Sequence, residues 1–201
     1  MISHIRIGVK SAESVPSWID IYFLGQYNRG MEHTLKTALA DAMRTFDLPR
    51  YEQLPDVGLY LEQTAKYINQ CLQPLGFAET TGSMIRNYVK MGLASNPVQK
   101  QYFAEHIAHL IAISVLKHVV PLEHIHKMFD TQKKVYTDRT AYNYFCMELE
   151  NVLYFRFGLK DDLEEIGVTE TLEKEILRSA IVAVSHMVYL NACLRFLPSE
   201  E

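Results

Sequence analysis

Four polar residues near the middle of the chain have the types and the spacing of a surface that reads nucleic acid. In a helix over residues 81–91 they stand at positions i, i+3, i+4 and i+7 and form one stripe: Ser83, Arg86, Asn87 and Lys90. Arginine and asparagine can each form two hydrogen bonds with a guanine or adenine edge, and lysine and serine suit phosphates. The stripe predicts contacts with double-stranded DNA, although an ordinary amphipathic surface helix would carry the same pattern.

The sequence around the stripe predicts the elements that would position it. The apolar residues of the same stretch share another face and can pack inward: Ile85, Tyr88 and Val89. Gly92 follows as a C-terminal cap. A second helical pattern runs from Val57 to Leu72 and ends before Pro74 and Gly76. A helix, a turn and a short helix with a polar face are typical of a helix-turn-helix.

The order of residues 81–93, TGSMIRNYVKMGL, resembles the recognition-helix stretch of MerR-type winged helix-turn-helix regulators. Residues 100–107, KQYFAEHI, are similar to the point where the wing of that family ends and its third helix begins. Residues 120–125, VPLEHI, are similar to the start of its next helix. The resemblance covers about residues 55–129. The stretch is also similar to a family of uncharacterised bacterial proteins that carry a MerR-like domain.

This resemblance implies a DNA-binding transcriptional regulator and assigns a role to each site residue. Arg86 and Asn87 would read bases, whereas Tyr88 would belong partly to the core and partly to a backbone contact. The phosphate contacts would come from three residues: Ser83, Lys90 and Lys100 on the wing. The chain departs from the family pattern in having Ser83 in place of an arginine and Asn87 in place of an aromatic residue. Its wing, residues 94–101, is short.

The distribution of charge agrees with a basic segment between acidic neighbours. The whole chain has 20 Lys and Arg, 24 Asp and Glu and a net charge of -4. Residues 1–80 carry -2, residues 81–127 carry +3 and residues 128–201 carry -5. Five of the eight histidines also lie in the middle segment. Such a segment is typical of a small nucleic-acid-binding domain, and a solvated helical face is the alternative.

The rest of the sequence predicts an all-α fold, a MerR-like winged helix-turn-helix followed by a C-terminal two-helix region. Further helical patterns cover residues 31–46, 104–119, 121–129, 133–155 and 170–197, the last with Thr169 as its N-cap. A strand is expected only at Ile19–Leu24 and in the minimal wing. We expect a loosely attached extension over 1–30, with Met31 as a second candidate start, and a helix and linker over 31–54. The helix-turn-helix domain would cover 55–129, and a dimerisation or effector region 130–201.

The apolar stretch Ser179–Leu194 predicts a helix buried within the fold or between subunits. We expect a homodimer, because one short reading head buries too little surface for useful affinity. With 16 residues and three polar side chains, the stretch is too short and too polar to cross about 30 Å of hydrocarbon. No membrane partner is therefore expected.

No sequence motif favours an enzyme, a cofactor or a metal site. The nine glycines form no phosphate-binding loop, and no G-x-S-x-G or H-E-x-x-H motif is present. The histidines lack the spacing of a structural metal site. The cysteines, at 71, 146 and 193, lie far apart, so we expect a cytoplasmic protein without a disulfide framework.

One alternative to DNA binding remains open, a helical module that keeps the fold but binds a protein or a small ligand. A set of aromatic residues in the C-terminal third could line a ligand pocket or form the core: Tyr136, Tyr142, Tyr144, Phe145, Tyr154, Phe155 and Phe157. The sequence does not identify an effector.

Overall fold

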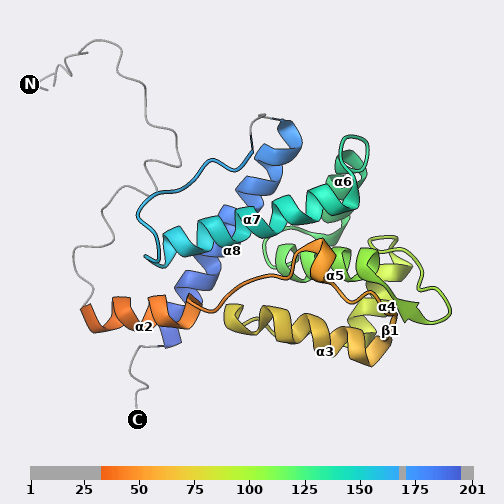
Figure 1. Cartoon of the computed structure of the whole chain (residues 1–201), viewed down its shortest axis with the longest axis horizontal. Helices are drawn as coiled ribbons and strands as arrows, with labels where there is room; N and C mark the ends of the chain where they lie inside the picture. The colour runs from red at the N-terminus through yellow and green to blue at the C-terminus, as the bar shows by residue number, and fades with distance from the viewer. Residues whose placement is uncertain (1–32, 168–170, 196–201) are drawn as a thin grey trace, which may run out of the picture. The chain divides into compact units, whose positions relative to one another are not determined.

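Helices dominate the computed structural model, which describes residues 33–167 and 171–195 (Figure 1). The helices are α2 (His33–Met43), α3 (Leu61–Leu72), α4 (Gly82–Lys90), α5 (Ala104–Leu116), α6 (Leu122–Gln132), α7 (Asp138–Arg156) and α8 (Leu172–Arg195). Two 3₁₀ turns, η1 (Tyr51–Gln53) and η2 (Gln73–Leu75), lie between them. The all-α class predicted from the sequence is confirmed for these residues.

The described residues also contain two short strands, β1 (Leu59–Tyr60) and β2 (Gln101–Tyr102). They pair antiparallel, with Leu59 opposite Tyr102 and Tyr60 opposite Gln101. The predicted helix from Val57 was wrong at its start: α3 begins at Leu61, because the two residues before it are extended and paired with β2. A strand of two residues has no alternation that a sequence could display.

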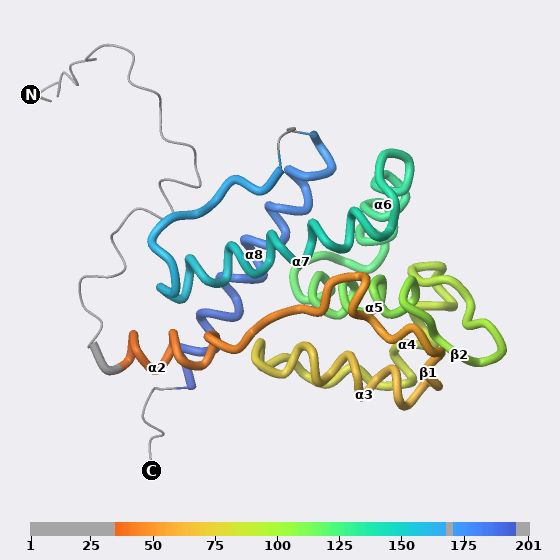
Figure 2. The backbone as a smooth tube through the Cα atoms, viewed as in Figure 1, coloured from red at the N-terminus to blue at the C-terminus, as the bar shows by residue number. Residues whose placement is uncertain are grey.

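Helix α5 forms the centre of the core. Every residue from His106 to Leu116 is buried. The helix packs against α3, α6, α7 and α8, and Figure 2 shows it between α3 and α7. An element covered on several sides must be apolar around most of its circumference, as this one is. The described residues, 33–167 and 171–195, belong to one compact unit.

The last two helices start later than the sequence predicted. Residues 133–137 precede α7, and the Thr137 hydroxyl caps its N-terminus by accepting a hydrogen bond from the Thr140 backbone N–H (3.2 Å). Thr171 caps α8, because its hydroxyl accepts from the Lys174 backbone N–H (3.4 Å). The proposed cap Thr169 lies outside the described residues, as do the predictions for Ile19–Leu24, for Met31 and for the extension over 1–30.

Helix α8 is longer than the apolar stretch predicted from the sequence. Within the described residues, its length of 24 residues and a mean hydropathy of 1.4 over an 18-residue window would allow it to cross a membrane. One side of α8 packs against α7 and is buried, including Ile181, Val184 and Val188. A core helix of a water-soluble protein has the same length and composition, and we interpret α8 as a core helix.

Helix α7 carries buried charges that are paired with other elements. Glu150 accepts hydrogen bonds from the Arg50 guanidinium (2.5 and 2.6 Å) and from the Leu48 backbone N–H (2.9 Å). This hydrogen bonding raises the pKa of Arg50. Glu148 is fully buried and lies 3.0 Å from Arg178 of α8, and burial raises the pKa of its carboxyl group. These pairs fasten α7 to α8 and to the segment before η1.

Candidate nucleic-acid interface

Helix α4 is capped by hydrogen bonds at both ends. The Thr81 hydroxyl accepts a hydrogen bond from the Met84 backbone N–H (3.3 Å) and caps the N-terminus. At the C-terminus the Gly92 N–H donates to the Val89 carbonyl (3.0 Å) and the Leu93 N–H to the Tyr88 carbonyl (3.0 Å). This is a Schellman motif, and Gly92 has the φ of 74° that the motif requires. The predicted C-terminal cap is confirmed.

The polar stripe lies on the exposed side of α4. Four of the predicted site residues are exposed there: Ser83, Arg86, Asn87 and Lys90. Ile85 is fully buried on the opposite side, as its spacing predicts. Within the described part of the chain, Arg86 and Lys90 form no ion pair. Their charges are therefore available to a partner.

Tyr88 differs from the other predicted site residues because it is only 3% exposed. Burial raises the pKa of its phenol, and the Lys117 ammonium lies 6.0 Å from the centre of its ring. This burial fits the core role that the sequence assigned to Tyr88, and its contact with the DNA backbone stays a prediction. Tyr88 lies with Ile85 on the face of α4 that the sequence predicts to be buried, and α4 packs against α3.

A tight hairpin places Lys100 at an exposed tip. Val98 and Gln101 exchange two backbone hydrogen bonds (3.0 and 2.9 Å), which leaves Gln99 and Lys100 as the turn. Both turn residues have positive φ, 51° and 67°. Two-residue hairpin turns of this kind favour Gly or Asn, so the two side chains here impose backbone strain. The predicted wing over 94–101 contains this hairpin.

The hairpin and α4 lie at the same end of the molecule, near the labels α4 and β2 in Figure 2. Burial raises the pKa of the Tyr102 phenol in β2, and the positive charge of Arg86 opposes this shift. Arg86 is thus within electrostatic reach of β2, the strand that follows the hairpin. The stripe on α4 and the hairpin therefore lie near each other.

The connection between α3 and α4 is longer than the turn of about three or four residues that is usual in a helix-turn-helix. It covers residues 73–81 and is held by the Asn69 side chain. The Asn69 side-chain amide accepts a hydrogen bond from the Thr80 backbone N–H (2.8 Å) and donates one to the Thr80 carbonyl (3.0 Å). The sequence analysis did not select Asn69, because nothing in the sequence signals a pairing with Thr80.

Lys117 adds a positive charge beside the stripe. It lines a broad hollow of about 580 Å³ together with the α4 residues Ser83, Met84, Asn87 and Tyr88. Burial lowers the pKa of its ammonium group. The sequence analysis did not select Lys117, although it belongs to the segment that carries +3.

One histidine near this surface, His106, serves the fold. The His106 ring accepts from the Phe103 backbone N–H at Nδ1 (3.1 Å), and its Nε2 lies 3.0 Å from the Asn96 carbonyl oxygen. Among residues 33–167 and 171–195, no three His, Cys, Asp or Glu side chains gather as a metal site would require. His106 instead joins the start of α5 to the loop before the hairpin.

Comparison with known proteins gives one match. No curated protein and no solved structure matches the chain. Residues 49–147 contain α3, α4, the hairpin, α5 and α6. These residues match the model of a family described as "Domain of unknown function (DUF1836)", so this part of the chain resembles an uncharacterised family.

Proposed function

We propose that this protein binds double-stranded DNA as a transcriptional regulator of the MerR-like type. The observation that carries the proposal is the exposed stripe on α4, whose two cations form no ion pair among the described residues. A folded protein gains little stability from exposed unpaired cations, whereas a phosphate-rich partner uses them directly. Such a regulator would act in the cytoplasm.

In this proposal α4 enters the major groove and the hairpin follows the phosphate backbone. Arg86 and Asn87 contact base edges. Ser83, Lys90 and Lys100 contact phosphates. The strained turn at Lys100 supports this role, because backbone strain gathers at functional sites. Few cations are involved, so the affinity of one reading head is modest and falls steeply with salt.

The proposed homodimer uses an exposed stripe along α8. Residues spaced four, three, four, seven and four positions apart face one side of this helix and are exposed: Leu172, Ile176, Ser179, Ala183, Leu190 and Leu194. The small side chains of Ser179 and Ala183 at its centre allow two helices to approach closely. A second copy of the chain presents the same stripe, which is what a twofold interface requires.

DNA binding can be tested without a known operator. The full chain is mixed with a pool of random duplexes, the bound duplexes are sequenced, and the enriched site is titrated by fluorescence anisotropy. Arg86→Ala is expected to lower the affinity for that site by about tenfold and to relax the preference at one base pair. Lys134→Ala removes an exposed cation after α6 and is the matched control, expected to change little. No enrichment, or equal affinities for wild type and Arg86→Ala, contradicts the proposal.

The dimer is tested by sedimentation equilibrium of the full chain. Leu190 is 57% exposed on α8, and Leu190→Glu is expected to give monomers by placing a charge in the interface. Val135 is 54% exposed and lies outside the stripe, so Val135→Glu is the control that keeps the dimer. A monomeric wild type, or a dimeric Leu190→Glu variant, contradicts this interface.

A further inference from the structure

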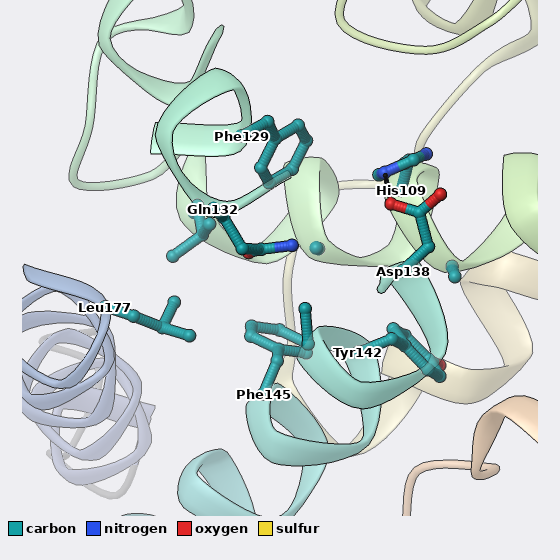
Figure 3. A pocket seen from close by; sticks show the side chains of 11 residues that line it. His109, Phe129, Gln132, Asp138, Tyr142, Phe145 and Leu177 are labelled. Carbon is teal, nitrogen blue, oxygen red and sulfur yellow. Dashed lines mark ion pairs between the residues drawn. The ribbon is translucent and has the colours of Figure 1, made fainter. Parts of the chain in front are cut away.

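Three cavities lie where α6, α7 and α8 meet. Their volumes are about 190, 140 and 20 Å³. Gln132 and Leu177 line all three cavities. Figure 3 shows the residues around the smallest cavity, with Phe129 and Gln132 above, Leu177 at the left and Phe145 below.

The walls of the 190 Å³ cavity are mainly aromatic and aliphatic. They include Tyr136, Tyr144, Met147 and Leu177. A dry cavity of about 150 Å³ admits a benzene molecule. The cavity here therefore has room for one aromatic ring with a small substituent. The innermost cavity holds no more than a group of the size of water, so a ring belongs in the larger space.

Gln132 supplies a polar group at the common wall. Figure 3 shows its side chain at the smallest of the three cavities, and Gln132 also lines the 190 Å³ cavity. Its amide forms no hydrogen bond with another residue of the described ranges. Gln132 is half-buried and its amide is not enclosed, so a bound hydroxyl group would replace water at this amide. The amide can both donate to and accept from a hydroxyl group.

The charged groups around the cavity balance one another. Glu173 and Lys174 line it with opposite charges. The Lys174 ammonium lies 5.2 Å from the centre of the Tyr144 ring, a cation–π distance. A cavity with one acid and one base has no preference for a net charge, so the composition of its walls favours a neutral ligand.

We propose that this cavity binds a small neutral aromatic molecule of one ring that carries a hydroxyl or N–H group. The ring occupies the space between Tyr136, Tyr144 and Leu177, and the polar group forms hydrogen bonds with the Gln132 amide. The site lies on α6, α7 and α8, away from the proposed DNA-binding surface. The test of this cavity is therefore independent of the test of DNA binding.

Phenol and toluene test the site, because they have nearly the same shape and differ in the hydrogen-bonding group. Isothermal titration of the full chain is expected to show that phenol binds more tightly than toluene. Gln132→Leu is expected to weaken phenol binding about three- to tenfold and to leave toluene unchanged. Gln70→Leu, at an exposed glutamine on α3, is the control and should keep the wild-type preference.

Two further measurements cover the case in which Gln132→Leu fails to fold. In the wild-type protein, nuclear Overhauser effects are expected between the phenol ring and the methyl group of Met147, which lines the cavity. Ala141→Leu is expected to block both ligands, because Ala141 lines the cavity and its larger replacement fills it. Absence of binding to the wild type, absence of these Overhauser effects, or an unchanged phenol preference in folded Gln132→Leu overturns the proposal.

Discussion

Helices α4 and α7 both carry ionisable side chains, but they place them in opposite environments. On α4, Arg86 and Lys90 are exposed and form no ion pair within the described residues. On α7, Glu148 and Glu150 are 0% and 7% exposed, and each is paired with an arginine from another element. The charges of α7 hold the fold together, whereas those of α4 are available to a partner.

This difference changes what the segment charges mean. Residues 128–201 carry a net -5, which suggests an acidic surface. Glu148 and Glu150 are nevertheless inside the protein, where they neutralise Arg178 and Arg50. The +3 of residues 81–127 is different, because its cations on α4 and at the hairpin tip reach the solvent. Exposure, rather than the sum of charges, separates a binding surface from a structural pair.

The largest expected effect is the loss of a buried carboxylate on α7. Glu150→Ala removes the partner of Arg50 and of the Leu48 N–H, and we expect the free energy of unfolding to fall by about 3 kcal/mol. Urea denaturation followed by circular dichroism measures this. Glu165→Ala, at an exposed acidic residue, should change stability by less than about 0.5 kcal/mol. Equal changes in the free energy of unfolding for the two variants would contradict the distinction between paired and exposed charges.

The second prediction concerns the support of the hairpin. A Cβ added at Gly58 would lie 2.7 Å from Gln101 Cβ and 2.8 Å from Phe103 Cζ, so the strands must move apart. Gly58→Ala is expected to destabilise the protein by about 1–3 kcal/mol. It should also weaken DNA binding, because Lys100 then shifts relative to α4. A variant with wild-type stability and affinity would show that the paired strands do not position the wing.

Buried histidine gives a third prediction, a dependence of stability on pH. Burial lowers the pKa of His109 below its ordinary 6.5, although Asp138 lies 3.2 Å away and opposes the shift. Below pH 6.5 the unfolded chain takes up a proton that folded His109 does not. The free energy of unfolding therefore falls as the pH drops from 6.5 through the folded pKa.

Urea denaturation at pH 7.5 and 5.5 measures this loss. His109→Gln is expected to lose less stability on acidification than the wild type. Some dependence remains, because the pKa values of His118 and His186 are also lowered by burial. His124→Gln removes an exposed histidine and should behave like the wild type. An unchanged pH dependence in His109→Gln would contradict the assignment.

The smallest expected effect is on the stability of a variant at the binding surface. Arg86→Ala is expected to change the free energy of unfolding by less than about 0.5 kcal/mol, because the side chain is exposed and forms no ion pair with a described residue. The same denaturation measurement applies. A loss of 2 kcal/mol or more, in the range of about 2–5 kcal/mol typical of core truncations, would mean that Arg86 belongs to the fold.

Local signals in the sequence predicted α4 well. Thr81 and Gly92 cap the helix by hydrogen bonds to its own end residues, so the information lies within a few positions. The spacing of Ile85 and Arg86 also predicted which side is buried and which is exposed. Whether the exposed side binds DNA remains a prediction.

Contacts between residues far apart in the chain could not be predicted from the sequence. The pairing of β1 with β2 joins Leu59 to Tyr102, and each strand is too short to show a pattern. The ion pair between Arg50 and Glu150 joins residues 100 positions apart. The shared cavity wall at Gln132 arises only when three helices meet. Such features depend on packing, and a single sequence does not display them.

The dependence of DNA affinity on salt tests the central claim most directly. Anisotropy titrations of the full chain with its selected duplex, at several salt concentrations, give the slope of log affinity against log salt. We predict a steep negative slope in the wild type, which decreases in magnitude by about one in Lys90→Ala and in Lys100→Ala and stays constant in Lys134→Ala. A slope near zero, or equal slopes in all four proteins, would contradict the proposal that the exposed charges of α4 and the hairpin bind DNA.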